Sequence, residues 1–154
     1  MLLSILIVDA STKSYAASRL PEMRYASWSF PYGGVGVFED LFGIEFSIVH
    51  ATNTGMAWSL LAHSPDLLLF VRGILIAAIF GYLLFFTPPL CYLLPLSCIL
   101  AGALGNVIDF FFYRHVVDLF YFVFWGYSYP VFNVADIAIT SGALALCFAG
   151  WKKR

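Results

Sequence analysis

Residues 67–87 read LLLFVRGILIAAIFGYLLFFT, a run of 21 residues in which Arg72 is the only charged side chain. About 20 such residues are enough for a helix to cross the hydrocarbon core of a bilayer, which is roughly 30 Å thick. Pro88 and Pro89 follow at once and end the helix, because proline lacks the backbone N–H that a helix interior requires. The stretch predicts a transmembrane helix in which Arg72, near its start, extends to the membrane interface.

The composition of the whole chain is also typical of a membrane protein. Of its 154 residues, 62% are hydrophobic and only 11% are charged, whereas a soluble domain carries about 25% charged residues. The mean hydropathy is +0.88. The formal net charge of −1 leaves no basic surface to neutralise phosphates, so we expect no nucleic-acid partner. The three cysteines have the spacing of neither a zinc site nor a disulfide framework, and we interpret them as small core residues.

Three further segments complete a predicted bundle of four transmembrane helices. Residues 90–112 and 131–151 are long and apolar, and a basic tail at 152–154 follows the second of them. Basic residues favour the cytoplasmic side of a membrane, so we expect the C-terminus there. Residues 2–20 are predicted to form the first helix, with its polar residues facing the bundle. Four crossings then place the N-terminus in the cytoplasm as well.

The expected fold class is therefore an all-α polytopic membrane protein with one membrane-embedded domain over residues 1–154. Residues 21–66 and 114–130 would lie on the extracytoplasmic side. Within the first of these segments, the β-branched and aromatic residues of 44–49 predict short strands. We expect a small β-rich segment over residues 21–66, resting on the membrane surface. The aromatic residues of 119–129 are interpreted as an interfacial belt.

Asp118 and Asp136 are ionisable groups in otherwise apolar surroundings. A charged side chain at the centre of a membrane helix costs about 2.5 to 3.5 kcal/mol on insertion scales, so such residues usually face a cavity and have a function. Asn133 shares a helix face with Asp136, and Asn106 shares a face of the preceding helix with Asp109. These side chains predict a shared polar site near the outer side of the membrane.

Two carboxylates in a site of low dielectric constant ionise together only at high cost, so the pair shares one proton near neutral pH. An aspartic protease needs this state. The ionised carboxylate takes a proton from water as the water attacks a peptide carbonyl, and the protonated carboxyl group stabilises the developing oxyanion.

Other interpretations of the same residues remain open. The aspartates could be structural, bonded to backbone groups at helix ends. They could also relay protons in a small proton-coupled transporter component, although the polar residues cluster toward one side of the predicted bundle. His115, three residues before Asp118, suggests a metal ligand, but no third ligand follows at a recognisable spacing. We therefore expect no metal and no cofactor.

Five short motifs add a resemblance to a known family. They are VDASTK at 8–13, NTGMAWS at 53–59, GALGNVID at 102–109, HVVD at 115–118 and FNVADIAI at 132–139. In this order and at this spacing they resemble the lipoprotein signal peptidases, the bacterial type II signal peptidases, from about residue 8 to the C-terminus. The resemblance implies a four-helix aspartic endopeptidase of the bacterial cytoplasmic (inner) membrane, with its active site toward the extracytoplasmic face.

The resemblance also implies substrate and site residues. Such an enzyme cleaves diacylglyceryl-modified prolipoproteins just before the lipidated cysteine, and Asp118 and Asp136 match its catalytic pair. The positions that match residues lining the site or binding substrate are Asn53, Gly55, Asn106, Asn133, Asp9 and Lys13. From their own spacing, we interpret Asp9 and Lys13 as an i, i+4 ion pair. The apolar flank of the bundle would hold the substrate lipid, and a monomer would be sufficient.

Two features depart from the family pattern. Phe110 stands where the family usually has an arginine that helps hold the substrate or the catalytic pair, and Arg114 would point into the same space if the helix continued. A catalytically inactive homologue that binds lipidated peptides is therefore a further alternative. The family's first helix also has more apolar residues before its aspartate–lysine motif, so we expect additional residues upstream of Met1.

Overall fold

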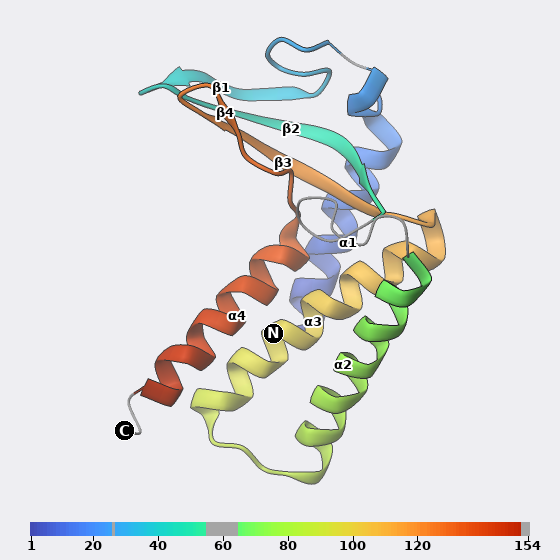
Figure 1. Cartoon of the computed structure of the whole chain (residues 1–154), viewed down its shortest axis with the longest axis vertical. Helices are drawn as coiled ribbons and strands as arrows, with labels where there is room; N and C mark the ends of the chain where they lie inside the picture. Colours follow the sequence, from blue (N-terminus) through green and yellow to red (C-terminus); the bar gives the residue numbers. More distant parts are fainter. Residues whose placement is uncertain (26, 55–64, 152–154) are drawn as a thin grey trace.

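The computed structural model of the chain describes residues 1–25, 27–54 and 65–151. This part contains four α-helices and four β-strands, with a short 3₁₀ turn at Met23–Tyr25. The helices are α1 (Leu2–Arg19), α2 (Pro65–Phe85), α3 (Leu90–Tyr113) and α4 (Val134–Trp151). The strands are β1 (Val35–Leu41), β2 (Ile44–Asn53), β3 (Val116–Phe124) and β4 (Tyr127–Ser128). The sheet lies at one end of the helical bundle, and α4 ends far from it (Figure 1).

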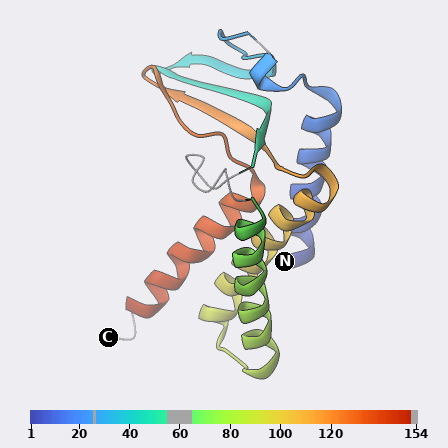
Figure 2. The same ribbon diagram turned by 45° about the vertical axis from the view of Figure 1, so that its right-hand side comes forward.

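Helix α3 is the centre of the bundle and packs against α1, α2 and α4. Its glycines allow α4 to approach closely. A Cβ atom added at Gly102 would lie 2.3 Å from the carbonyl oxygen of Ala135, and one added at Gly142 of α4 would lie 2.7 Å from the carbonyl oxygen of Pro95. Small residues at such contacts let helix backbones pack tightly in a membrane. Helix α2, by contrast, packs mainly on α3, which lies between α2 and α4 in Figure 1. In Figure 2 the lower ends of α2 and α4 point away from each other.

Three of the described helices are long and apolar enough to cross a membrane: α2 from Asp66, α3 and α4. The helices predicted at 67–87, 90–112 and 131–151 are confirmed, with ends that shift by at most three residues. The helix predicted at 2–20 also forms, as α1, but the charged and polar residues in its second half lower its hydropathy. Its crossing of the membrane stays a prediction.

The sheet is antiparallel in the order β1-β2-β3-β4. The strands predicted between residues 21 and 66 are confirmed by β1 and β2. Residues 119–129 were expected only as an interfacial belt, whereas they supply most of β3 and all of β4. The sheet is therefore larger than predicted and joins two distant parts of the chain. Asp118 lies near the start of β3, which begins at Val116 shortly after α3 ends, and Ala51 of β2 lies opposite it.

Candidate active site

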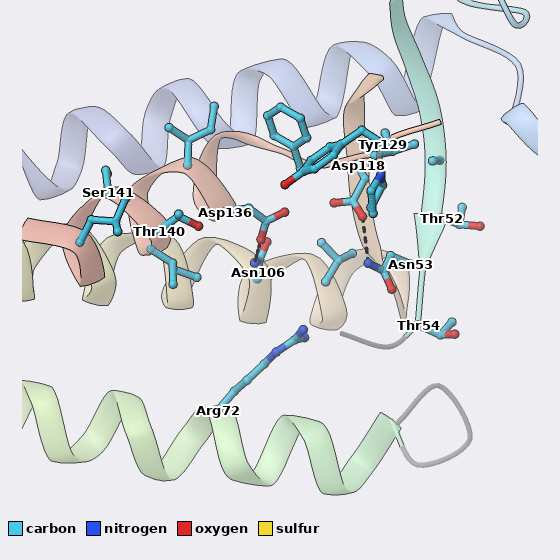
Figure 3. A pocket seen from close by; sticks show the side chains of 18 residues that line it. Thr52, Asn53, Thr54, Arg72, Asn106, Asp118, Tyr129, Asp136, Thr140 and Ser141 are labelled. Carbon is cyan, nitrogen blue, oxygen red and sulfur yellow. Dashed lines mark hydrogen bonds between the residues drawn. The ribbon is translucent and has the colours of Figure 1, made fainter. Parts of the chain in front are cut away.

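A cavity of about 750 Å³ lies where the sheet meets the bundle, a size typical of small-molecule and peptide sites. Asp118 of β3 and Asp136 of the first turn of α4 both line it (Figure 3). The structure thus brings the two predicted catalytic residues to one cavity. Its other polar lining residues are Thr52, Asn53, Thr54, Arg72, Asn106, Tyr129, Thr140 and Ser141.

Asn133 precedes α4 and determines where Asp136 lies. The backbone N–H of Asn133 donates to Oδ2 of Asp136 at 3.2 Å, and the backbone N–H of Asp136 donates to Oδ1 of Asn133 at 2.9 Å. This reciprocal pair is a capping box, which satisfies backbone donors that have no partner within the helix. The local sequence Asn-Val-Ala-Asp therefore both begins the helix and orients the Asp136 carboxylate.

Asn133 also reaches the second aspartate. Its Nδ2 donates to Oδ1 of Asp118 at 2.7 Å, and it further contacts Oδ1 of Asn106 at 3.2 Å and the carbonyl oxygen of Val117 at 3.3 Å. The Asn133 residue is fully buried. One amide side chain therefore connects the start of α4, the middle of α3 and strand β3.

The remaining oxygens of the two carboxylates are also held by amide groups. Nδ2 of Asn53, at the end of β2, donates to Oδ2 of Asp118 at 3.0 Å. Nδ2 of Asn106, on α3, donates to Oδ1 of Asp136 at 3.0 Å. Each carboxylate is thus fixed by two hydrogen bonds, and the three asparagines that provide the side-chain donors were all predicted from the sequence.

The proton affinity of Asp118 is unusual. The pKa of its carboxyl group is raised from 3.8 to about 7, mainly by burial and also by the negative charge of Asp136, while the hydrogen bonds from Asn53 and Asn133 act in the opposite direction. Only 3% of Asp118 is exposed. Near neutral pH this carboxyl group is therefore suited to hold a proton while it faces a second carboxylate.

A buried charge network lies behind the cavity. The Lys13 ammonium group, 1% exposed, contacts Oδ2 of Asp9 at 2.8 Å, Oδ2 of Asp109 at 2.9 Å and Oδ1 of Asn106 at 3.0 Å. Asp9 accepts a hydrogen bond from the backbone N–H of Ala135 at 2.8 Å, and Asp109 accepts one from Val117 at 3.1 Å. The network joins α1, α3, α4 and β3 through charges that are paired, as a buried charge requires.

The predicted i, i+4 pairing of Asp9 with Lys13 is confirmed by their contact. Neither side chain is part of the cavity lining, so their assignment to substrate binding stays a prediction, and their contacts favour a role in positioning. Asn53 and Asn106 line the cavity, and Asn133 lies just behind it. Gly55, the last predicted site residue, lies outside the residues that the structure describes.

The expectation for Arg114 is wrong. Helix α3 ends at Tyr113, and Arg114 takes a left-handed conformation with φ of 65° as its C-cap. The change of direction leaves its side chain exposed and away from the cavity.

Sequence analysis missed Arg72 as a residue of the site. Its side chain extends from α2 into the cavity and lines it together with Asn106 and Asp136 (Figure 3). Its position relative to the membrane interface stays a prediction. The signal that could have found it is the single cation in an apolar run of 21 residues, because an ionisable residue inside a membrane segment usually faces a cavity.

Comparisons with known proteins show which family this chain belongs to. Residues 1–152 match the family model described as Signal peptidase (SPase) II. The chain is 30% identical over 143 residues to the lipoprotein signal peptidase of Clostridium acetobutylicum, which covers 92% of this chain and 84% of that protein. It is 34% identical over 152 residues to the lipoprotein signal peptidase of Syntrophus aciditrophicus, with the same coverage of 92% and 84%.

The fold is also similar to that of a solved protein, a bacterial membrane enzyme determined by the in meso method at 2.3 Å resolution. The TM-score is 0.79 at 25% sequence identity, and the match covers 98% of this chain and 85% of that one. A family match over nearly the whole length, relatives at 30% identity or more and three helices able to span a membrane lead to one conclusion: the chain belongs to the signal peptidase II family and is a membrane protease.

Proposed function

We propose that this protein is a lipoprotein signal peptidase of the bacterial inner membrane that works as an aspartic endopeptidase. It removes the signal peptide from diacylglyceryl-modified prolipoproteins by cleaving the peptide bond before the lipidated cysteine. The observation that carries the proposal is that Asp118 and Asp136, from different elements, face one cavity and are joined through Asn133.

The chemistry needs one ionised and one protonated carboxyl group. The ionised carboxylate removes a proton from a water molecule as the water oxygen bonds to the carbonyl carbon of the scissile peptide. The protonated carboxyl group donates to the carbonyl oxygen and stabilises its developing negative charge. When the C–N bond breaks, the pair protonates the leaving nitrogen. The signal peptide then carries a new carboxyl terminus, and the lipidated cysteine carries a new amino terminus.

The apolar part of the cavity supports a lipid-bearing substrate. Ile137, Ile139 and Leu144 of α4 line it, together with Val131 and Phe132 just before this helix. Apolar surfaces of this kind suit acyl chains, because they remove hydrocarbon from water without unpaired polar groups. The amide-bearing end of the cavity, near Asp118, suits the peptide part of the same substrate.

The proposed topology places the whole chain in one membrane-embedded domain that acts as a monomer. Helix α1 is the fourth span beside α2, α3 and α4, both termini are cytoplasmic, and the sheet lies on the extracytoplasmic side. Support comes from the basic tail at 152–154, which follows the end of α4 that lies far from the sheet (Figure 1). The cavity is at the opposite end, where a secreted substrate would arrive.

The proposal is tested by incubating the purified protein in lipid with a diacylglyceryl-modified signal peptide and measuring cleavage. The parent protein is compared with Asp118→Asn and Asp136→Asn, which are nearly isosteric, and with Asp66→Asn, an exposed carboxylate outside the cavity, as control. We expect the parent and the control to cleave before the lipidated cysteine. Each active-site variant should lose about 10²- to 10⁴-fold in kcat.

The other outcomes are equally informative. If the folded parent binds the peptide without cleaving it, the protein is an inactive homologue that only captures lipidated peptides. If both active-site variants cleave as fast as the parent, the assignment of Asp118 and Asp136 is wrong.

A further inference from the structure

Arg72 is the one cationic side chain among the described residues that line the active-site cavity. It belongs to α2, which is otherwise apolar from Leu67 to Phe85 and able to span a membrane. A charged group in such a segment costs free energy unless it lines a polar cavity or binds a partner, and its presence usually marks a functional site. The position of Arg72 therefore needs a functional account.

The geometry sets Arg72 across the cavity from the carboxylates. Asp118 and Asp136 approach from β3 and α4, whereas the Arg72 side chain reaches in from α2 on the other side (Figure 3). The guanidinium group is close enough to interact electrostatically with both carboxylates. Since α2 packs mainly on α3, a peptide entering between α2 and α4 would lie between the guanidinium group and the aspartate pair.

Several other polar groups in the cavity donate hydrogen bonds within the protein. The amide groups of Asn53 and Asn106 donate to the carboxylates. The hydroxyl groups of Thr52 and Ser141 donate to Glu22 and to the carbonyl oxygen of Ala138. An arginine has five N–H donors in a fixed planar arrangement and no acceptor. Arg72 therefore carries more N–H donors than any other described residue that lines the cavity.

A bound peptide would need such donors. An extended main chain presents carbonyl oxygens that lose their water when they enter an apolar cavity, and an unpaired carbonyl oxygen is costly there. We propose that Arg72 is a substrate-binding residue, whose guanidinium group donates hydrogen bonds to main-chain carbonyl oxygens of the peptide that lies across Asp118 and Asp136. The inference rests on the proposed function and names the group that holds the substrate on the α2 side.

The first test is steady-state cleavage of the diacylglyceryl-modified peptide by Arg72→Gln, with Arg114→Gln as the matched control. Arg114 is an exposed arginine outside the cavity, so its replacement makes the same chemical change without touching the substrate. We expect Arg72→Gln to raise KM by about tenfold or more, the effect of one or two lost charge-assisted hydrogen bonds. The kcat value should stay close to that of the parent, and Arg114→Gln should match the parent in both KM and kcat.

The second test measures binding without cleavage. The Kd of the same peptide is compared between Asp118→Asn and the double variant Asp118→Asn with Arg72→Gln. We expect the double variant to bind about tenfold or more weakly. This comparison needs no turnover, so it tests the role of Arg72 even if the parent protein does not cleave the peptide. A parent protein that does not cleave would count against the proposed function and not against this inference.

Two results would overturn the inference. One is a KM and a Kd that do not change when Arg72 is replaced. The other is a loss of kcat at constant KM with a shifted pH profile, which would show that Arg72 acts on the aspartate pair instead of the substrate. If Arg72→Gln does not fold, Arg72→Lys decides, since it keeps the charge but loses the planar arrangement of donors. We expect a several-fold rise in KM for Arg72→Lys, and an unchanged KM would refute substrate binding.

Discussion

Asn133 donates a hydrogen bond from Nδ2 to Oδ1 of Asp118 over 2.7 Å, and the same residue begins helix α4 by capping it. The geometry of the two candidate catalytic carboxylates is therefore set by a helix cap. Asp136 is placed by the local turn of α4, and Asp118 is placed by a single amide group that reaches from this turn to the sheet.

Replacing this amide group should affect both stability and catalysis. Asn133→Ala removes the cap of α4 and one of the two donors to Asp118. We expect a loss of about 1 to 3 kcal/mol in unfolding free energy, together with a fall in kcat of about tenfold or more because the carboxylates are no longer held in register. Asn53→Ala, which removes the other donor to Asp118 without disturbing the cap, should destabilise the protein less. Equal kcat values for Asn133→Ala and the parent would contradict this account.

The raised pKa of Asp118 predicts a pH dependence of activity. With a pKa of about 7, the carboxyl group keeps its proton below this pH and loses it above. We expect kcat/KM to decline as the pH rises above about 7, approaching about a tenfold loss per pH unit once the shared proton is gone. The measurement is a pH–rate profile in lipid, with vesicle integrity checked at each pH. If kcat/KM stays constant from about pH 6 to about pH 9, Asp118 does not share a proton in this range.

The same pKa makes a prediction about stability. The folded protein holds the Asp118 proton more tightly than the unfolded chain, whose carboxyl group has the ordinary pKa of 3.8. Its stabilising contribution is therefore fully present below this value and is lost as the pH rises through about 7. Thermal unfolding of the parent should show Tm falling over this range, and Asp118→Asn should show a shallower slope. An identical slope in both proteins would place the titration elsewhere.

The buried ammonium group of Lys13 should be essential to folding. Lys13→Met leaves Asp9 and Asp109 buried without the cation that contacts both, and breaking such a pair costs about 3 to 5 kcal/mol. A matched surface pair is available in Arg24 and Glu22, 2.7 Å apart and largely exposed on the arginine side. Arg24→Gln should cost no more than about 1 kcal/mol. Adding Asp109→Asn to Lys13→Met should restore part of the lost stability, and no recovery would argue against charge pairing as the cause.

Two glycine replacements distinguish the effect of close helix packing on stability from the effect of helix propensity. Gly102→Ala places a Cβ atom 2.3 Å from the carbonyl oxygen of Ala135, so α3 and α4 must move apart and stability should fall by about 1 to 3 kcal/mol. The same movement would displace Asp136 and lower kcat. Gly81 of α2 has no atom within 4 Å of an added Cβ, so Gly81→Ala should change stability by less than about 1 kcal/mol. The measurements are the thermal unfolding and the cleavage rate of both variants. If Gly102→Ala is as stable and as active as Gly81→Ala, the close contact between α3 and α4 is excluded.

The fold was predictable from the sequence wherever the signal is local. A long apolar run ended by two prolines specifies α2, and the same reasoning finds α3 and α4. Strand β3 was missed because Val116–Phe124 is apolar at almost every position, without the alternation that marks a half-buried strand. Its partner β2 lies more than 60 residues earlier in the chain, as the pairing of Ala51 with Asp118 shows, and no local pattern reports such a pairing.

For the candidate site too, local contacts could be predicted from the sequence and contacts between distant segments could not. The spacing of Asp9 and Lys13 predicts their ion pair, because residues four apart lie on one helix face. The further contacts of Lys13 with Asp109 and Asn106 come from another helix, and spacing within one segment carries no information about them. The position of Arg72 in the cavity lining was missed because the sequence does not specify which way a side chain on α2 points relative to α3.

The two candidate carboxylates sit at the junction between the sheet and the bundle, one on β3 and one at the first turn of α4. In the proposed topology this junction lies at a fixed height above the hydrocarbon core. A substrate whose acyl chains remain in the lipid would present only the bond next to its anchor at that height. The height of the site above the membrane, rather than the amino-acid sequence of the substrate, would then select the peptide bond that is cleaved. One small enzyme could in this way process many precursors that share little beyond a lipid and a cysteine.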